Sequence, residues 1–184
     1  SRDGVRLLHI DRQSQAVTHS QFKQLPSFLN RSDLIVFNRS RTLPAVLLGH
    51  DTVTGTVVEL RLAEHLNDDS WLALLICHGR DEENTFKCGL RQGLKLELPG
   101  NLEAEVVSRD SRIHRLWRLR FNKPYSELIA LLFKYGRPVR YEHVPQRWPI
   151  DFYQNVYASE PGSAEMPSAG RAFTWSLLFD LHRR

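Results

Sequence analysis

Six short strand-like runs follow one another between residues 45 and 121, and no helical pattern lies between them. Turn signals separate the runs, such as Thr54-Gly55, the acidic stretch Asn67–Asp69 and Pro99-Gly100. Regularly spaced short strands without intervening helices are typical of antiparallel barrels and sandwiches. The sequence therefore predicts a small antiparallel barrel or sandwich, with strands at about 45–50, 56–64, 70–77, 94–98, 103–108 and 113–121.

The segment before this region mixes strand and helix patterns. Residues 5–10 have a strand pattern, and residues 22–29 have the pattern of a short amphipathic helix that Pro26 interrupts. The apolar run at residues 33–37 is continuous rather than alternating. Because strands covered on both faces are apolar throughout, this run predicts a strand buried on both faces.

Helical patterns resume after residue 121. One helix is expected to begin at Ser126 and to end at Gly136, in a left-handed cap conformation just before Pro138. Two shorter helical pieces are expected at residues 151–157 and 174–182.

A chain of 184 residues is long enough for one domain or two small ones. We expect an α/β (α+β) body that an inserted small antiparallel β-barrel interrupts. The body is then a discontinuous domain of residues 1–44 and 122–184, and the inserted β-barrel domain covers residues 45–121.

Composition narrows the classes of protein that remain. No run approaches the ~18 apolar residues that a membrane helix needs, and the first residues contain no apolar signal-peptide region. The only cysteines, Cys77 and Cys88, suggest neither a disulfide framework nor a zinc site. The eight histidines form no HxxxH or HxH pair. We therefore expect a cytoplasmic protein with no membrane segment and no structural metal.

The net charge of +4 and the pI near 9.3 permit a polyanionic partner. Basic residues gather between Arg112 and Arg147. In the strand expected at 113–121, Arg118 and Arg120 point away from Trp117 and Leu119. Such a basic row can follow a phosphate backbone, or it can be a solvated edge strand that its charge protects.

Arginines and aromatic residues alternate in the segment after the expected helix. Arg137 and Arg140 lie beside Tyr141 in a loop that Pro138 stiffens, and Arg147-Trp148 repeats the pairing a few residues later. Arginine next to a stacking aromatic ring can hold an unstacked base, although packing explains the pattern equally well. Because these pairs flank Tyr153, we expect them to share one cleft.

Two further segments have the composition of ligand-binding loops. Asn38, Ser40 and Arg41 follow the apolar run 33–37, at the place where α/β sheets bind ligands. The stretch 153–174 contains two tight, small-residue spots before a helical pattern, an arrangement that can present backbone N–H groups to an anion. The alternatives are a polar interdomain turn for the first segment and a loop that only caps a helix for the second.

Three ordered stretches, LIVFNRSRTLPAVLLG, YGRPVRYEHV and YQNVYASEPGSAEMPSAGRAFT, resemble the S-adenosylmethionine:tRNA ribosyltransferase-isomerase family of queuosine biosynthesis. The resemblance runs in one order along nearly the whole chain. It implies an α/β body with an inserted β-barrel. It also implies transfer of the ribosyl part of S-adenosylmethionine to an aminomethyl-deazaguanine in tRNA, with isomerisation to epoxyqueuosine.

The motifs of that family imply site residues in this chain. The pattern F-N-[DN]-[ST]-R assigns substrate binding to Asn38 and Ser40 and a catalytic role to Arg41. The other two patterns, Y-Q-x-V-[YF]…P-G and P-[TS]-A-G-L-H-F, assign a catalytic role to Ser168 and substrate binding to Tyr153, Gln154, Tyr157, Gly162, Pro167, Ala169 and Gly170. With tRNA as substrate, the tRNA-binding candidates are Arg118, Arg120, Arg137 and Arg140. S-adenosylmethionine is the ribosyl donor, tRNA is the partner, and we expect a monomer.

The chain also departs from the family pattern. Arg39 stands where the family usually has Asp, and Arg171-Ala172 stands where it has Leu-His. A histidine is the usual proton-transfer group near neutral pH, so its loss bears directly on catalysis. The family's later T-L-H-x-G-x-G-T-F segment is not in this sequence. We therefore expect these 184 residues to be the middle of a longer enzyme and to be inactive alone.

Two alternatives to the transferase remain open. Extra arginines at positions 39 and 171 suit a divergent paralogue that binds RNA or a nucleotide without this catalysis. The other alternative is a structural fragment whose active site is incomplete.

Overall fold

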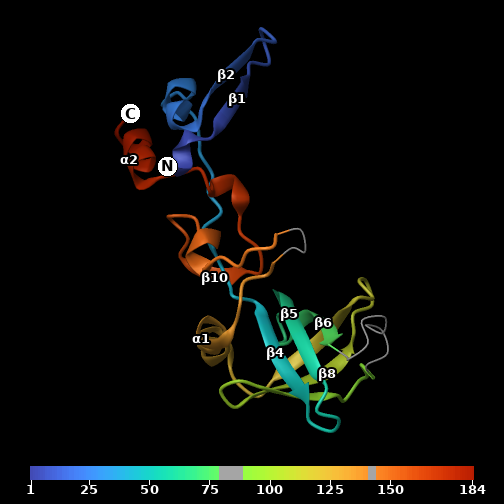
Figure 1. Ribbon diagram of the computed structural model, residues 1–184. Helices are drawn as coiled ribbons and strands as arrows, with labels where there is room; N and C mark the ends of the chain where they lie inside the picture. Colours follow the sequence, from blue (N-terminus) through green and yellow to red (C-terminus); the bar gives the residue numbers. More distant parts are fainter. Residues whose placement is uncertain (79–88, 141–143) are drawn as a thin grey trace.

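The computed structural model describes residues 1–78, 89–140 and 144–184 (Figure 1). The two α-helices are α1 (Tyr125–Tyr135) and α2 (Trp175–Arg183), and short 3₁₀ turns lie at Arg2–Gly4, Phe22–Phe28, Ile150–Tyr153 and Ser168–Gly170. The strands are β1 (Arg6–Ile10), β2 (Val17–Gln21), β3 (Ser40–Thr42), β4 (Val46–Asp51), β5 (Val57–His65), β6 (Trp71–His78), β7 (Lys95–Leu98), β8 (Leu102–Arg109), β9 (Leu116–Phe121) and β10 (Glu160–Ser163).

Strands β4 to β9 form a closed antiparallel barrel in the order β4-β5-β6-β9-β8-β7. Alternate residues of each strand point inward, as with Leu60 and Leu62 of β5 and Leu119 of β9, which are at most 2% exposed. The six strands lie where the sequence predicts them. Of the two predicted alternatives, barrel and sandwich, the structure is the barrel.

Helix α1 extends the barrel core, because Leu128 and Leu132 belong to the same buried cluster as the inward side chains of the strands. After α1 the chain returns to the barrel wall, where Arg137 and Val46 exchange two backbone hydrogen bonds of 2.9 Å. The helix ends at Gly136 as predicted. The predicted left-handed cap is wrong, because Gly136 has φ −74° and ψ 167°. A glycine is needed there because a Cβ would lie 2.1 Å from the carbonyl oxygen of Pro44.

Two small sheets lie outside the barrel. Strands β1 and β2 form an antiparallel hairpin, and β3 pairs in parallel with β10. The β3–β10 pair joins a segment that directly precedes the barrel to one that follows it by about 40 residues. Figure 1 shows this pair between the barrel below and the hairpin with α2 above.

The strand predicted at residues 33–37 is wrong. Those residues are in no strand, and Leu34 and Val36 are 88% and 83% exposed. No element within the described ranges covers them, and an apolar run does not by itself show that a neighbour is present to bury it. The helical piece predicted at 151–157 is only the 3₁₀ turn Ile150–Tyr153, whereas the one at 174–182 is confirmed as α2.

Cys77 is 4% exposed and belongs to the buried core of the barrel, and it is disulfide-bonded, which the sequence did not predict. Cys88 lies outside the described residues. Within the described ranges, no helix is long and apolar enough to cross a membrane. The same ranges contain no group of three or more His, Cys, Asp or Glu side chains arranged to hold a metal ion.

We expect Gly136→Ala to lower the free energy of unfolding by about 1–3 kcal/mol, because the new methyl group meets backbone oxygens rather than a mobile side chain. The measurement is chemical denaturation. Gly4→Ala is the matched control, since nothing lies within 4 Å of a Cβ built at that glycine. Equal stabilities of the two variants would contradict the close approach at Gly136.

Candidate functional site

A cleft of about 600 Å³ lies between the outer wall of the barrel and the segment that follows α1. We call it the arginine cleft. One wall is the outer face of β4 and β5, and the other is built from the end of α1 and the loops after it. Its lining residues are Val46, Leu48, His50, Glu59, Arg61, Pro99, Tyr135, Arg137, Pro138, Arg140, Arg147, Trp148 and Tyr153.

Backbone contacts hold the loop side of the arginine cleft. The two hydrogen bonds between Arg137 and Val46 fix the beginning of the loop against β4. Farther along, Nη1 of Arg140 donates to the carbonyl oxygens of Val144 and Pro145, at 3.2 and 3.0 Å. The loop is therefore tied to the barrel at one end and braced internally at the other.

The charge of the arginine cleft is strongly positive. Four arginines line it, and the one acidic lining residue, Glu59, accepts a 2.6 Å hydrogen bond from Arg61. Tyr135, Trp148 and Tyr153 add aromatic surface, and Trp148 is 42% exposed with its ring 4.9 Å from that of Phe152. Guanidinium groups beside exposed aromatic rings suit phosphates and unstacked bases.

The structure places Arg137, Arg140, Arg147, Trp148 and Tyr153 in one cleft, as predicted, whereas Tyr141 lies outside the described residues. The sequence analysis missed the residues of the opposite wall, His50, Glu59 and Arg61. Their signal was present in the alternation of β4 and β5, but alternation does not identify which outward row faces another segment.

Arg118 and Arg120 lie on a different wall from the arginine cleft. Both are on β9, which is three strands away from β4 in either direction around the barrel. Arg118 also forms an ion pair with Asp68, at 3.2 Å. The predicted tRNA-binding arginines are therefore divided between two sides of the barrel.

The predicted substrate-binding loops meet at the β3–β10 pair. The hydroxyl of Ser163 on β10 donates to the hydroxyl of Ser40 on β3. Oδ1 of Asn38 accepts from the backbone N–H of Ser40 at 2.9 Å and so shapes the approach to β3. Arg41 extends toward α1, where its Cζ lies 4.7 Å from the centre of the Phe133 ring.

Gln154 clamps β3 through its side-chain amide. Its Oε1 accepts from the backbone N–H of Thr42 at 2.9 Å, and its Nε2 donates to the carbonyl oxygen of Thr42 at 2.8 Å. The hydroxyl of Thr42 donates to the carbonyl oxygen of Tyr153 at 2.7 Å. Both ends of the amide are thus used to hold the backbone, and a role for Gln154 in substrate binding stays a prediction.

The segment Pro167–Gly170 forms a closed turn rather than a helix start. The N–H groups of Gly170 and Arg171 donate to the carbonyl oxygens of Pro167 and Ser168, and α2 begins only after its N-cap residue Thr174. These two N–H groups are therefore engaged within the turn, which differs from the anion-binding arrangement that the sequence suggested.

Gly170 packs against two polar side chains. A Cβ at that position would lie 1.9 Å from the hydroxyl oxygen of Tyr157 and 2.6 Å from Nδ2 of Asn155. Burial raises the pKa of the Tyr157 hydroxyl above its ordinary value. Asn155 is 4% exposed, and its Oδ1 has no hydrogen-bond partner among the described residues. The sequence analysis did not single out Asn155, because it lies at a variable position of the motif.

An aromatic cluster connects the two predicted loops. The rings of Tyr157 and Phe173 both lie 5.0 Å from the ring of Phe37, which directly precedes Asn38. The loops are thus neighbours through these rings. Even so, neither the arginine cleft nor the second cavity is lined by Asn38, Ser40, Arg41, Tyr157, Pro167, Ser168, Ala169 or Gly170.

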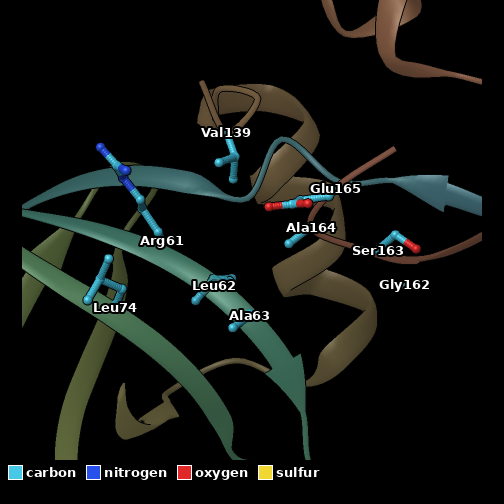
Figure 2. Close-up of a pocket in the computed structure, with 9 residues that line it drawn as sticks. All are labelled: Arg61, Leu62, Ala63, Leu74, Val139, Gly162, Ser163, Ala164 and Glu165. Atoms are coloured by element: carbon cyan, nitrogen blue, oxygen red, sulfur yellow. The ribbon is translucent and has the colours of Figure 1, made fainter. Parts of the chain in front are cut away.

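A second cavity, of about 520 Å³, lies on the other side of Arg61 (Figure 2). The residues that follow β10 approach the outer face of β5 and β6 there. The lining residues are Arg61, Leu62, Ala63, Leu74, Val139, Gly162, Ser163, Ala164 and Glu165. Among the predicted substrate-binding residues, Gly162 lies in this cavity and Tyr153 in the arginine cleft, so the two cavities adjoin the same loop region.

Fold and site together define a class of protein: a closed β-barrel with a positively charged aromatic cleft on its outer wall, whose side chains suit a nucleic acid. Residues 1–184 match the family model described as queuosine biosynthesis protein, and the chain belongs to that family.

Several relatives carry the name S-adenosylmethionine:tRNA ribosyltransferase-isomerase. The protein of Heliobacterium modesticaldum is 34% identical over 184 residues, covering 100% of this chain and 51% of its own length. The protein of Thermus thermophilus is 35% identical over 178 residues, which cover 96% of this chain and 50% of the length of that protein. The chain thus spans about half the length of the curated relatives it matches.

A solved structure, the S-adenosylmethionine tRNA ribosyltransferase of Thermotoga maritima, is 22% identical and matches with a TM-score of 0.39. The match covers 99% of this chain and 48% of that one.

We expect Gln154→Met to lower the free energy of unfolding by about 2–4 kcal/mol, because it leaves both backbone groups of the buried residue Thr42 unpaired. Chemical denaturation measures the change. Gln92→Met is the matched control at an exposed glutamine. If both variants kept the parent's stability, the clamp on β3 would have no energetic role.

Proposed function

We propose that this chain is the barrel-bearing part of an S-adenosylmethionine:tRNA ribosyltransferase-isomerase. The enzyme transfers the ribosyl moiety of S-adenosylmethionine to an aminomethyl-deazaguanine in tRNA and isomerises it to epoxyqueuosine. The observation that carries the proposal is the arginine cleft, in a chain that matches the queuosine biosynthesis family over all 184 residues. The names of the relatives supply the donor and the acceptor.

The arginine cleft supports tRNA as the acceptor. The guanidinium groups of Arg137 and Arg147 are available to phosphates at its mouth, because both residues are exposed. Trp148 and Tyr153 offer rings against which an unstacked base can lie. Arg140 contributes charge while it braces the loop. A wobble nucleotide must leave its stack before its base can be modified. A cleft of this composition can bind the unstacked base and its phosphates.

The loops at the β3–β10 pair support a neighbouring reaction centre. We assign substrate binding there to Asn38, Ser40, Tyr157, Gly162, Pro167, Ala169 and Gly170, and catalytic roles to Arg41 and Ser168. The contact between Ser40 and Ser163 and the rings of Phe37, Tyr157 and Phe173 support their nearness to one another. The reaction proposed needs no metal.

We also propose that the barrel, residues 45–121, interrupts an α/β body made of residues 1–44 and 122–184. The parallel pairing of β3 with β10 supports this, because it joins the two flanking segments. We further propose that the protein is a monomer, that its partner is tRNA, and that it acts in the cytoplasm.

A second candidate is a paralogue that binds RNA without ribosyl transfer. The observation in its favour is Arg171-Ala172 at the position of the family's Leu-His, which leaves the turn after Ser168 without a histidine. The RNA-binding role of the arginine cleft is common to both candidates.

The deciding experiment incubates the full-length protein with tRNA containing the aminomethyl-deazaguanine and with S-adenosylmethionine labelled in its ribose. We expect label in the tRNA, and we expect Arg41→Ala to abolish its transfer while the thermal unfolding curve is unchanged. RNA binding without transfer by the parent would favour the second candidate. Absence of both would overturn the proposed function.

We expect tRNA binding to weaken steeply with salt and the double variant Arg137→Gln/Arg147→Gln to flatten the slope of log K against log[salt] by about 1.4–1.8, since each lost phosphate contact removes about 0.7–0.9. The matched control, Arg118→Gln/Arg120→Gln, removes the same charge from β9. A flatter slope only in the control variant would indicate that the RNA binds the β9 side of the barrel instead of the arginine cleft. Equal losses would give both sides phosphate contacts.

A further inference from the structure

The second cavity differs from the arginine cleft in chemical character. Its floor is the outer face of β5 and β6, where Arg61 and Leu74 are direct cross-strand neighbours. Leu62, Ala63, Val139 and Ala164 make most of the remaining lining apolar. It therefore lacks the aromatic rings and most of the arginines that suit the cleft to RNA.

Glu165 supplies the negative charge of the second cavity. Figure 2 shows its carboxylate extending across the cavity toward the side of Val139. No described residue forms a hydrogen bond or an ion pair with Glu165. Arg61, the only other charged lining residue, directs its Nε to Glu59, which lines the arginine cleft. The second cavity is thus an apolar space with one carboxylate available to a ligand.

The two cavities therefore differ in the charge that they present to a ligand, and Arg61 lines both of them. Phosphates are attracted to the side with Arg137, Arg140 and Arg147, which repels a cation. A cation with hydrocarbon arms is favoured on the other side, where the exposed carboxylate of Glu165 lies beside apolar side chains. A sulfonium ion has this chemistry, with a positive sulfur that carries carbon substituents only.

We propose that the second cavity receives the sulfonium end of S-adenosylmethionine and that Glu165 faces its positive charge. The inference rests on the proposed function for the identity of the donor, and it adds a binding residue that the family motifs do not assign. The volume of about 520 Å³ lies within the range of small-molecule sites. Gly162 and Ser163 line the cavity, and the hydroxyl of Ser163 contacts Ser40, so a donor held there is adjacent to the proposed reaction centre.

The test compares S-adenosylmethionine with S-adenosylhomocysteine, whose neutral thioether lacks the sulfonium charge. Calorimetric titration of the full-length protein measures both affinities in the parent and in Glu165→Gln. We expect the variant to bind S-adenosylmethionine about tenfold more weakly, the size of one partly solvated charge pair. Binding of S-adenosylhomocysteine should change by less than about twofold, because no charge is lost from that pair.

Glu160→Gln is the matched control, since it removes an exposed carboxylate from β10 outside the cavity. It should leave both affinities unchanged. Equal losses for the two ligands in Glu165→Gln, no loss for either, or no binding of S-adenosylmethionine by the parent would each overturn the inference.

The transfer assay separates this inference from the proposed function. Suppose that the parent transfers label and that the Glu165→Gln variant binds both ligands as the parent does. That result would show that Glu165 is not in the donor site, while the proposed function would stand. Suppose instead that binding depends on Glu165 and on the sulfonium charge, but that no label is transferred. That result would support the donor site and overturn the proposed function.

Discussion

The parallel pairing of β3 with β10 is the contact on which the arrangement of the whole molecule depends. It joins residues 40–42 to residues 160–163 across the entire barrel sequence. The clamp of Gln154 on Thr42 and the hydroxyl contact between Ser40 and Ser163 secure it from both sides. Because β4 begins only four residues after Thr42, this pair also fixes where the later segments meet the barrel.

Both cavities are consequences of that placement. The residues before β10 form part of the arginine cleft, and those at its end form part of the second cavity. Arg61 lines both, because β5 is the barrel strand over which the returning chain passes. A side chain in such a position sets the boundary between two electrostatic environments, and its ion pair with Glu59 holds its guanidinium on one side of that boundary.

The sequence predicted the parts of this structure that have a regular period. The six barrel strands and α1 were placed correctly because alternation and helical spacing each leave a repeating signal. β3 and β10 were not predicted, since strands of three and four residues are too short to show a period, and β10 also contains Pro161 and Gly162. The apolar run at 33–37 was misread because its pattern contains no information about whether a neighbour covers it. At Gly136 the glycine was noticed, but its cause, the nearby oxygen of Pro44, is a long-range contact. The cleft was half predicted: its loop side follows from adjacent Arg and aromatic residues, whereas Arg61 required knowledge of which strand faces the loop.

The closure of the barrel is uneven. Strands β5 and β6 are paired along almost their whole length, whereas β4 and β7 share only His50↔Glu97 and Asp51↔Leu96. Local opening costs least where the fewest contacts must break, so the β4–β7 seam is where the barrel opens first and where its amide protons exchange earliest. Because β4 is also a wall of the arginine cleft, a ligand that binds only the closed cleft holds this seam shut. A ligand on the outer surface therefore slows the local opening of the barrel and the amide exchange at the β4–β7 seam.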